Sequence, residues 1–510
     1  MSLGKNDKHL RCCFVTNSLM NILWKTSTSW KLLVLRPYSK TLVSNKFLLL
    51  SPNKLYSCTL LQCLSVIASL ETTSWRIDRF YDWLKAGNVY MPKVKLGYNA
   101  DGLRGLVATE DIHCEEIFLK VPRERSLQVT ELEECTLSDF IDPDLWLLET
   151  WYVKLALKLW KEKCLGDCSS WKPYIDILPS ELNTGLVYWS DEDLAQLQYR
   201  PLIEEVERNK LYRKASYMRI VESIRFKLQD EDKNMFFWAL DMVQSRAFGI
   251  PEDGKKIYAL LPIMDMLNHR RNSQTHLLYD STRNEYVMKT YSKLFQSKDI
   301  YISYGPLDND HLLHFYGFVE KNNVYDNIQV KDLLQWLYLT YGNEWLSQPS
   351  HLLEEKLCVL TTHHVYESGK PFRIYYDRYE KEIDIVLRTL VASETDWKQI
   401  KENFALGLYD KAVSLENQLS VWQVVIDGCK QLLKDMKTSI EEDENILENM
   451  EPLPTKLRLA VQFRMEKKNI LLATISRLEH FQKISKKTGR IITVWIPPTL
   501  KRITLQKYDI

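Results

Sequence analysis

The sequence predicts an α+β fold, in which a β-rich core is split by a helical insertion and followed by an all-α C-terminal domain. Strand signals occur in two separate stretches, residues 102–121 and residues 261–305. The stretch between them, from about Leu127 to Gln244, has helical periodicity instead. After Asn322, glycine and proline are scarce and helical signals continue.

The composition is that of an ordinary globular protein. The chain has 510 residues, of which 45% are hydrophobic and 26% charged, so it is long enough for two or more domains. The formal net charge of +1 provides no overall field for nucleic acid or membranes, and we expect neither as a direct partner. Ten scattered cysteines indicate reduced thiols. Cys164 and Cys168 have no second pair nearby, so we expect no metal site.

Residues 1–74 are predicted to be a poorly ordered basic N-terminal extension. Between residues 11 and 70 there are seven lysines or arginines and no aspartate or glutamate. This composition resembles an organelle transit peptide. We favour an extension outside the folded protein, and we expect a cytoplasmic or nuclear location, with mitochondrial targeting as the less favoured alternative.

The folded chain is predicted to begin with a helix over Trp75–Ala86, where apolar residues recur at helical spacing. Gly102 and Gly105 lie in a turn that leads into an apolar strand, which indicates close approach of the backbone to a neighbour. Ile112–Val121 is predicted to be a second strand, and Pro122 ends it.

The middle of the chain is predicted to be helical. Its helix signals fall at Leu145–Lys161, Asp191–Gln198, Leu202–Lys227 and Met235–Val243. The segment Trp171–Pro179 contains two prolines, and we expect Trp171 and Tyr174 to be buried in the core. Arg246 follows the last of these helices.

The stretch from Leu261 to Phe318 contains the residues most typical of a binding site. An apolar run ends in Asn268 and His269, which indicates a buried segment delivering two polar side chains to an edge. Residues 301–305 alternate as a strand does, and Gly305-Pro306 breaks it. Tyr304, at the end of this strand, is well placed to line a pocket.

The C-terminal region is predicted to be a helical bundle. Helices are predicted at Leu333–Tyr341, Ile383–Ala392, Trp397–Gly407 and Ser414–Met436, and an apolar stripe from Leu457 to Leu478 predicts a further long helix. The acidic run Glu441–Glu444 predicts a solvated loop. We assign no role to the basic segment Arg490–Ile510.

The ordered motifs together resemble those of SET-domain lysine methyltransferases. Asn268-His269, Tyr304-Gly305 and Tyr316-Gly317-Phe318 are similar to the branch typified by the plant Rubisco large-subunit methyltransferase. The resemblance covers roughly Trp75 to the C-terminal helices. It implies a SET domain at 75–325 with a helical insertion at about 127–244, and a helical C-terminal domain at 326–510 that helps hold the protein substrate.

The resemblance also implies a cofactor, S-adenosyl-L-methionine, and roles for particular residues, with no metal. Tyr304 would be the catalytic residue. Cofactor contacts would come from Gly102, Leu103, Arg104, Gly105, Arg246, Asp265, Asn268, His269, Tyr304 and Phe318. Substrate contacts would come from Arg246, Tyr316 and Phe318. The family's glycine pattern is usually Gly-x-Gly-Leu, and Leu103 stands in place of its first glycine.

The implied reaction is in-line methyl transfer to a lysine of a histone or another protein. The enzyme must align amine, methyl group and sulfur, and an aromatic channel must keep the amine uncharged. Two alternatives remain open at this point: a catalytically silent SET fold that binds proteins, and a protein-histidine methyltransferase. We expect a monomer, and the substrate and the number of methyl groups transferred are not fixed by the sequence.

Overall fold

The computed structural model describes residues 20–26, 29–35, 75–99, 102–181, 185–224, 230–252, 254–342, 349–367, 369–450 and 452–491. The chain divides into two compact units, residues 1–79 and residues 80–510. In the first unit, β1 (Met20–Thr26) and β2 (Ser29–Leu35) form an antiparallel pair. The rest of the predicted extension at 1–74 lies outside the described residues, so its poor order stays a prediction. None of the described helices is both long and apolar enough to span a bilayer.

The predicted first helix is present and covers residues 75–86. The described strands that follow it, up to residue 302, form three small sheets. The first sheet contains β3 (Val94–Tyr98), β4 (Arg104–Ala108), β12 (Asp299–Ile302) and β9 (Asn268–His269), in that order. The second contains β10 (Thr275–Asp280), β11 (Glu285–Thr290) and β5 (Ile117–Pro122). The third contains β6 (Leu127–Thr130), β8 (Lys255–Leu260) and β7 (Phe248–Glu252).

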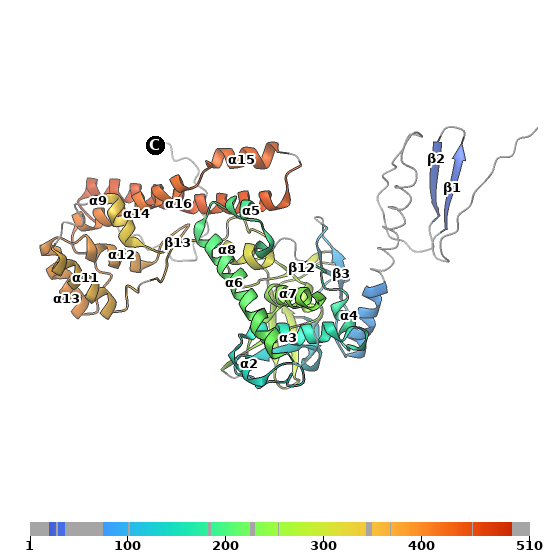
Figure 1. The fold of residues 1–510 in the computed structure, drawn as a ribbon. Helices are drawn as coiled ribbons and strands as arrows, with labels where there is room; N and C mark the ends of the chain where they lie inside the picture. Colours follow the sequence, from blue (N-terminus) through green and yellow to red (C-terminus); the bar gives the residue numbers. More distant parts are fainter. Residues whose placement is uncertain are drawn as a thin grey trace, which may run out of the picture. The chain divides into compact units, whose positions relative to one another are not determined.

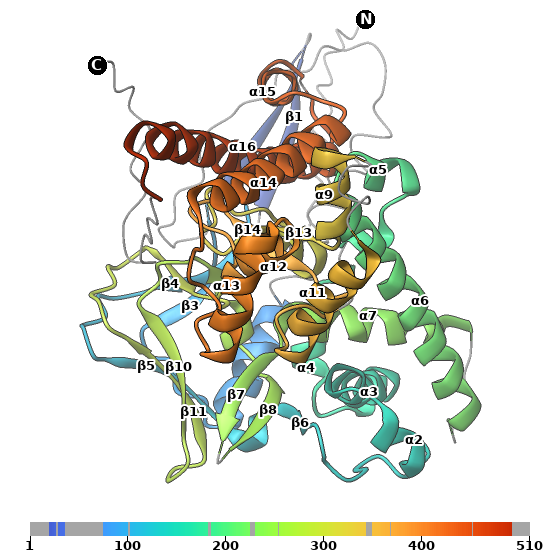
Figure 2. The same cartoon turned by 90° about the vertical axis from the view of Figure 1, so that its left-hand side faces the viewer.

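Strands from both sides of the insertion pair directly in each of these sheets. All pairs are antiparallel except β9 with β12, which is parallel. The pairing brings strands before residue 130 against strands after residue 248, and Figure 2 shows β3, β4, β5, β10 and β11 gathered in one region. The sequence prediction of one β-rich core interrupted by helices therefore describes this part correctly.

Helices occupy most of the insertion. They are α2 (Pro143–Leu148), α3 (Trp151–Cys164), α4 (Lys172–Ile175), α5 (Asp191–Ala195), α6 (Arg200–Ser223) and α7 (Asp230–Arg246), with short 3₁₀ turns η1 (Arg123–Arg125), η2 (Gly166–Cys168) and η3 (Leu186–Tyr188). The predicted helical range starts too early, because Leu127–Thr130 is strand β6, whose Leu127 and Val129 alternate into the core. The predicted helix Leu145–Lys161 is two helices, since the backbone is extended at Glu149 and Thr150.

The C-terminal region is mainly helical and packs α14 against α16 (Figure 1). Its helices are α9 (Leu333–Tyr341), α11 (Ser350–Thr362), α12 (Lys381–Leu390), α13 (Glu394–Ala405), α14 (Leu415–Asp435), α15 (Ile440–Asn449) and α16 (Thr455–Thr488). It is not all-α as predicted, because β13 (Asn327–Val330) and β14 (Phe372–Tyr375) form an antiparallel pair. The pair forms because Ile328, Val330, Phe372 and Ile374 alternate into the core.

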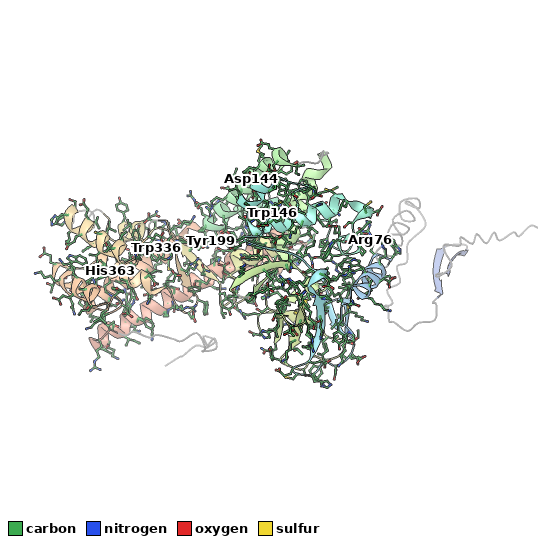
Figure 3. All side chains as sticks on the ribbon, turned by 90° about the horizontal axis from the view of Figure 1, so that it is seen from below. Arg76, Asp144, Trp146, Tyr199, Trp336 and His363 are labelled. Atoms are coloured by element: carbon green, nitrogen blue, oxygen red, sulfur yellow. The ribbon has the colours of Figure 1, made fainter. Side chains whose placement is uncertain are left out.

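The described residues of the second unit form two hydrophobic cores. Trp146 of α2 belongs to the core beneath the three sheets, whereas Trp336 of α9 belongs to the core of the C-terminal region. Tyr199, which precedes α6, belongs to the second core although it lies in the insertion. These residues are labelled in Figure 3. The insertion therefore packs against both the strand-rich core and the C-terminal helices.

Candidate functional site

The parallel pairing of β9 with β12 brings the two central motifs together. Asn268 lies opposite Tyr301, and His269 lies opposite Ile302, so the chain after β12 runs past His269. The backbone N–H of Tyr304 donates a hydrogen bond to Nδ1 of His269 at 3.0 Å. Nδ1 therefore accepts, and in a neutral ring the proton is on Nε2, which lies 3.8 Å from the carboxylate of Glu320.

Tyr304 lies just beyond the end of β12, in a largely buried position. Its hydroxyl donates to the backbone carbonyl of Leu267 at 2.9 Å. Its ring centroid lies 5.0 Å from that of His269 and 4.8 Å from that of Tyr316. Burial raises the pKa of Tyr304 well above its ordinary value, so the phenol stays protonated and acts as a hydrogen-bond donor rather than as a base.

The aromatic residues Tyr316 and Phe318 are positioned by an irregular helix. Asn309–His311 (α8) continues into a π-helical turn, η5 (Leu312–Tyr316), and Gly317 ends it with a left-handed φ of 73°. Only glycine adopts this φ without strain, and it reverses the chain so that Phe318 returns to the site. The ring of Phe318 lies 5.8 Å from that of His269 and 6.4 Å from that of Tyr316. Burial raises the pKa of Tyr316 to about 12.

Asp265 and Arg246 form a buried charged pair beside this aromatic group. Nη1 of Arg246 lies 3.4 Å from a carboxylate oxygen of Asp265 and donates to its backbone carbonyl at 3.0 Å. Tyr174 donates its hydroxyl hydrogen bond to the same carboxylate oxygen at 2.7 Å. Burial raises the pKa of Asp265, and Arg246 opposes that rise.

The short turn η4 (Met264–Met266), which presents Asp265, starts from a strained residue. Ile263 has a φ of 68°, a conformation that β-branched residues rarely adopt. Such strain is maintained only where the surrounding structure requires it, and it is often found at functional sites. Two polar atoms nearby, Nε of Arg246 and Oδ1 of Asp265, are buried without a hydrogen-bond partner among the described residues.

Of the four residues of the glycine turn, two lie at the site and two lie at the surface. Gly105 packs so closely on Asn268 that an added Cβ would lie 2.6 Å from Nδ2 of that side chain. Arg104 is part of the buried charged group, where burial and then Arg246 lower its pKa. Gly102 and Leu103 lie in the exposed turn before β4, and 58% of Leu103 is exposed. The structure therefore brings together all the predicted site residues except these two.

A cavity of about 300 Å³ opens between these elements. Its lining includes the predicted residues Arg246, Asp265, Tyr304 and Tyr316. It also includes residues that the sequence did not indicate, namely Ala247–Pro251, Leu267, Thr275–Leu277 and Ile302. Strands β7 and β10 present most of these additional residues, and their approach depends on sheet packing that no local pattern reveals. Among the described residues, no group of three or more His, Cys, Asp or Glu is arranged to hold a metal ion.

The fold as a whole is that of the SET domain of the Rubisco large-subunit methyltransferase (LSMT). The solved structure of that SET domain bound to lysine and AdoHcy has a TM-score of 0.63 and 22% identity, and the match covers 81% of this chain and 92% of that chain. The structure of Rubisco LSMT bound to AdoMet has a TM-score of 0.62, 22% identity and coverage of 81% and 93%. Residues 347–471 also match the sequence model described as Rubisco LSMT substrate-binding.

Curated relatives carry the name actin-histidine N-methyltransferase. The Homo sapiens protein is 28% identical over 410 residues, and the match covers 75% of this chain and 66% of that protein. The Rattus norvegicus protein is 30% identical over 391 residues, covering 72% and 62%. The chain thus spans slightly less than two thirds of the length of these relatives. Within the branch, the motifs suggested SET domain-containing protein 4 as the most similar member, and the relatives found here do not support that finer resemblance.

Proposed function

We propose that the chain is a protein methyltransferase that uses S-adenosyl-L-methionine and modifies a lysine side chain. The observation that carries this proposal is the convergence of Tyr304, Tyr316 and the buried pair Arg246–Asp265 on one cavity, with the ring of His269 against Tyr304. The similarity to SET-domain structures solved with AdoMet, and with lysine and AdoHcy, supports the same conclusion.

The unpaired polar atoms of the site fit the amino-acid part of this cofactor. Among the residues that the structure describes, Oδ1 of Asp265 has no hydrogen-bond donor and Nε of Arg246 has no acceptor. An ammonium group and a carboxylate, both present in S-adenosylmethionine, would satisfy them, and unsatisfied buried polar atoms are costly. We assign further cofactor contacts to Gly105, Asn268 and His269; the missing Cβ of Gly105 makes room for the Asn268 amide beside it. When bound, the cofactor supplies an electrophilic methyl group on its sulfonium.

The protein side chains would align the acceptor and favour its uncharged form. The cavity wall combines the aromatic rings of Tyr304 and Tyr316 with aliphatic Leu267 and Ile302. A lysine ammonium placed there loses solvation, so its pKa falls and its proton passes to solvent, which leaves the neutral amine. The hydroxyl of Tyr304, already anchored on a carbonyl, would accept a hydrogen bond from the amine and orient its lone pair.

Lysine is our preferred acceptor because the cavity suits four methylene groups. Its lining is largely apolar, with Phe248, Leu267, Leu277 and Ile302 contributed by different elements. A protein-histidine methyltransferase is the second candidate, and the names of the curated relatives favour it. We further propose that the C-terminal helical region, which includes the matched residues 347–471, holds the protein substrate.

The test is a transfer assay with the full chain. The protein is incubated with labelled S-adenosylmethionine and whole-cell lysate, and modified residues are identified by mass spectrometry. Tyr304→Phe is compared with Tyr301→Phe, a matched change on the adjacent strand β12. Label on lysine that is lost only in Tyr304→Phe supports the proposal, whereas label on histidine selects the second candidate. Failure to bind S-adenosylmethionine in calorimetry would leave a SET fold that only binds proteins.

A further inference from the structure

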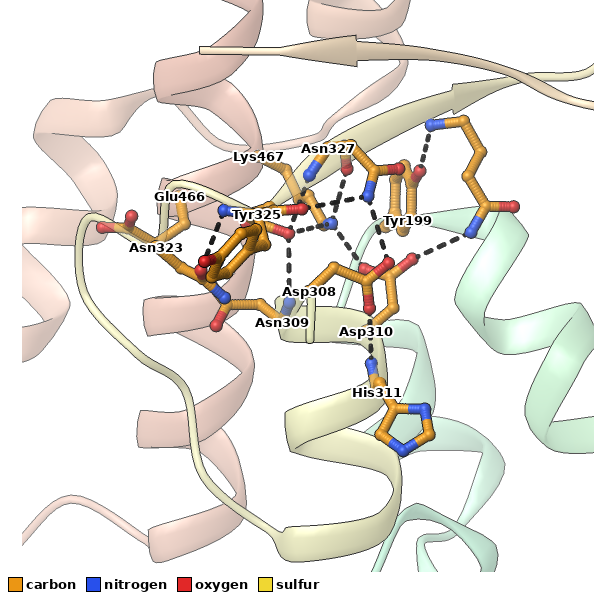
Figure 4. A network of polar contacts seen from close by, with 12 residues as sticks. Tyr199, Asp308, Asn309, Asp310, His311, Asn323, Tyr325, Asn327, Glu466 and Lys467 are labelled. Carbon is orange, nitrogen blue, oxygen red and sulfur yellow. Dashed lines mark hydrogen bonds and ion pairs between the residues drawn. The ribbon is translucent and has the colours of Figure 1, made fainter. Parts of the chain in front are cut away.

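A fully buried lysine of helix α16 contacts both ends of the segment that contains Tyr316 and Phe318. Nζ of Lys467 lies 2.5 Å from a carboxylate oxygen of Asp310 and 2.7 Å from one of Asp326, and it donates to the carbonyl of Asn327 at 2.7 Å (Figure 4). The rings of Tyr199 and Phe463 lie 5.0 Å from the ammonium. The ammonium therefore donates two hydrogen bonds, to Asp326 and Asn327, and forms an ion pair with Asp310, so all three partners lie within residues 310–327.

Asp326 also belongs to a hydrogen-bond network within the segment 309–327. Asp326 accepts hydrogen bonds from the backbone N–H and the side-chain amide of Asn309, at 3.2 and 3.0 Å. Asn309 in turn exchanges two hydrogen bonds with the backbone of Glu320, at 3.1 and 3.0 Å. The start, middle and end of the segment 309–327 are thus tied to one another at the point where Lys467 enters.

The segment 309–327 contains the aromatic residues of the proposed active site. Tyr316 and Phe318 lie between Asn309 and Glu320, and the Glu320 carboxylate lies 3.8 Å from Nε2 of His269. His269 accepts the hydrogen bond from the backbone N–H of Tyr304. A continuous chain of polar contacts therefore runs from Lys467 through Asn309 and Glu320 to the ring beside the catalytic tyrosine.

Stability alone does not explain this arrangement. Buried ion pairs are often no more stabilising than well-packed apolar residues of similar size, because desolvation offsets the attraction between the charges. What such a pair does provide is one defined geometry, because each buried charge must keep its partner. Two carboxylates converge on one ammonium, and burial raises the pKa of Asp310 to about 7 despite the nearby Lys467. Losing the ammonium would therefore separate the groups that it holds.

We propose that Lys467 is a positioning residue for methyl transfer, and that through Asp310 and Asp326 it fixes the segment bearing Tyr316 and Phe318. The inference rests on the proposed function for its catalytic part. The C-terminal region then has two roles. The first part of helix α16, up to residue 471, belongs to the stretch matched by the substrate-binding model, and Lys467 in that part also positions Tyr316 and Phe318.

The test compares Lys467→Met with Lys356→Met in the full chain. Lys356 is equally buried, but its ammonium bonds to the carbonyls of Leu390 and Ala392, away from the site elements. Hydrogen exchange of amides 309–320 should become at least tenfold faster in Lys467→Met and stay unchanged in Lys356→Met. With the acceptor identified in the transfer assay, kcat of Lys467→Met should fall at least tenfold while KM for S-adenosylmethionine stays within twofold.

Equal exchange in the two variants, or faster exchange with unchanged kcat, would overturn the inference. If Lys467→Met does not fold, Asp326→Asn replaces it, with Asp443→Asn as its control. Asp443 is a buried carboxylate that binds Arg464 and Lys468 of the same helix α16 but lies on α15. Hydrogen exchange can be measured without turnover, so it tests the role of Lys467 in holding the segment 309–320. Absence of transferase activity would instead refute the proposed function.

Discussion

Replacing Gly105 with alanine should separate cofactor binding from folding. The new Cβ would lie 2.6 Å from Nδ2 of Asn268. Since non-bonded carbon contacts are relaxed near about 3.5 Å, the amide must move by roughly 1 Å. This movement stretches its 3.2 Å hydrogen bond to the carbonyl of Arg104.

The substitution should lower both the folding stability and the affinity for the cofactor, and the two losses can be measured separately. Overpacking of this kind destabilises a protein by about 1–3 kcal/mol, and a domain with about 5–15 kcal/mol of stability stays folded. We expect the displacement of Asn268 to cost at least about 1.4 kcal/mol of binding free energy, which corresponds to at least a tenfold loss of affinity. Calorimetric titration with S-adenosylhomocysteine measures this loss, and thermal unfolding measures the loss of stability.

Gly97 provides the matched control for this change. It lies directly opposite Gly105 in the pairing of β3 with β4, and its added Cβ would lie 2.5 Å from a methyl carbon of Val107. Gly97→Ala should therefore cost a similar amount of stability but leave Asn268 in place and the affinity unchanged. If both variants lose affinity equally, or if Gly105→Ala binds as well as the original chain, the assignment of Asn268 to the cofactor site is wrong.

Three further changes test other parts of the site. Tyr304→Phe removes the donor to the Leu267 carbonyl, so we expect at least tenfold slower transfer and about 1 kcal/mol lower stability, measured against Tyr301→Phe. Asp265→Asn should weaken S-adenosylhomocysteine binding at least tenfold in calorimetry, because its amide replaces a charged acceptor; unchanged affinity would exclude a direct contact. Asp310 has a folded pKa of about 7, above the ordinary 3.8, so its protonated form favours folding. Unfolding free energy relative to Asp310→Asn should therefore fall as pH rises from about 4 to 7, and parallel pH curves would contradict this.

The sequence predicted the site motifs well because local pattern and strand pairing agree there. The alternation before Gly305 predicts a strand, and the apolar run before Asn268 predicts a buried segment that delivers two polar side chains to an edge. In the structure, β9 (Asn268–His269) follows that run and pairs with β12. The sequence could not indicate that Tyr174 binds Asp265, because residues 91 positions apart meet only through packing of the insertion. It identified Tyr174 as buried, which is correct, but not its polar contact.

The predicted solvated loop at Glu441–Glu444 is wrong for a related reason. Ser439 caps a helix there, α15, with a capping box that its spacing from Glu442 provides. Asp443 is fully buried because Arg464 and Lys468, on α16, neutralise it at 2.6 Å. A run of acidic residues usually indicates a solvated surface, and only the tertiary partners, more than twenty positions away, reveal the exception.

The buried charges of α16 face two different neighbours. Arg464 and Lys468 bind Asp443 of α15, within the C-terminal region. Lys467 instead binds Asp310 and Asp326, on the two sides of Tyr316 and Phe318. A helix that only packed a hydrophobic bundle would not need ammonium groups at fully buried positions, since apolar residues avoid the desolvation cost. Each charge instead requires specific polar partners. Because the two networks share one helix, it follows from the proposed function that a movement of α16 would act on Tyr316 and Phe318 through Lys467, so that docking of a protein substrate and alignment of its acceptor would be coupled.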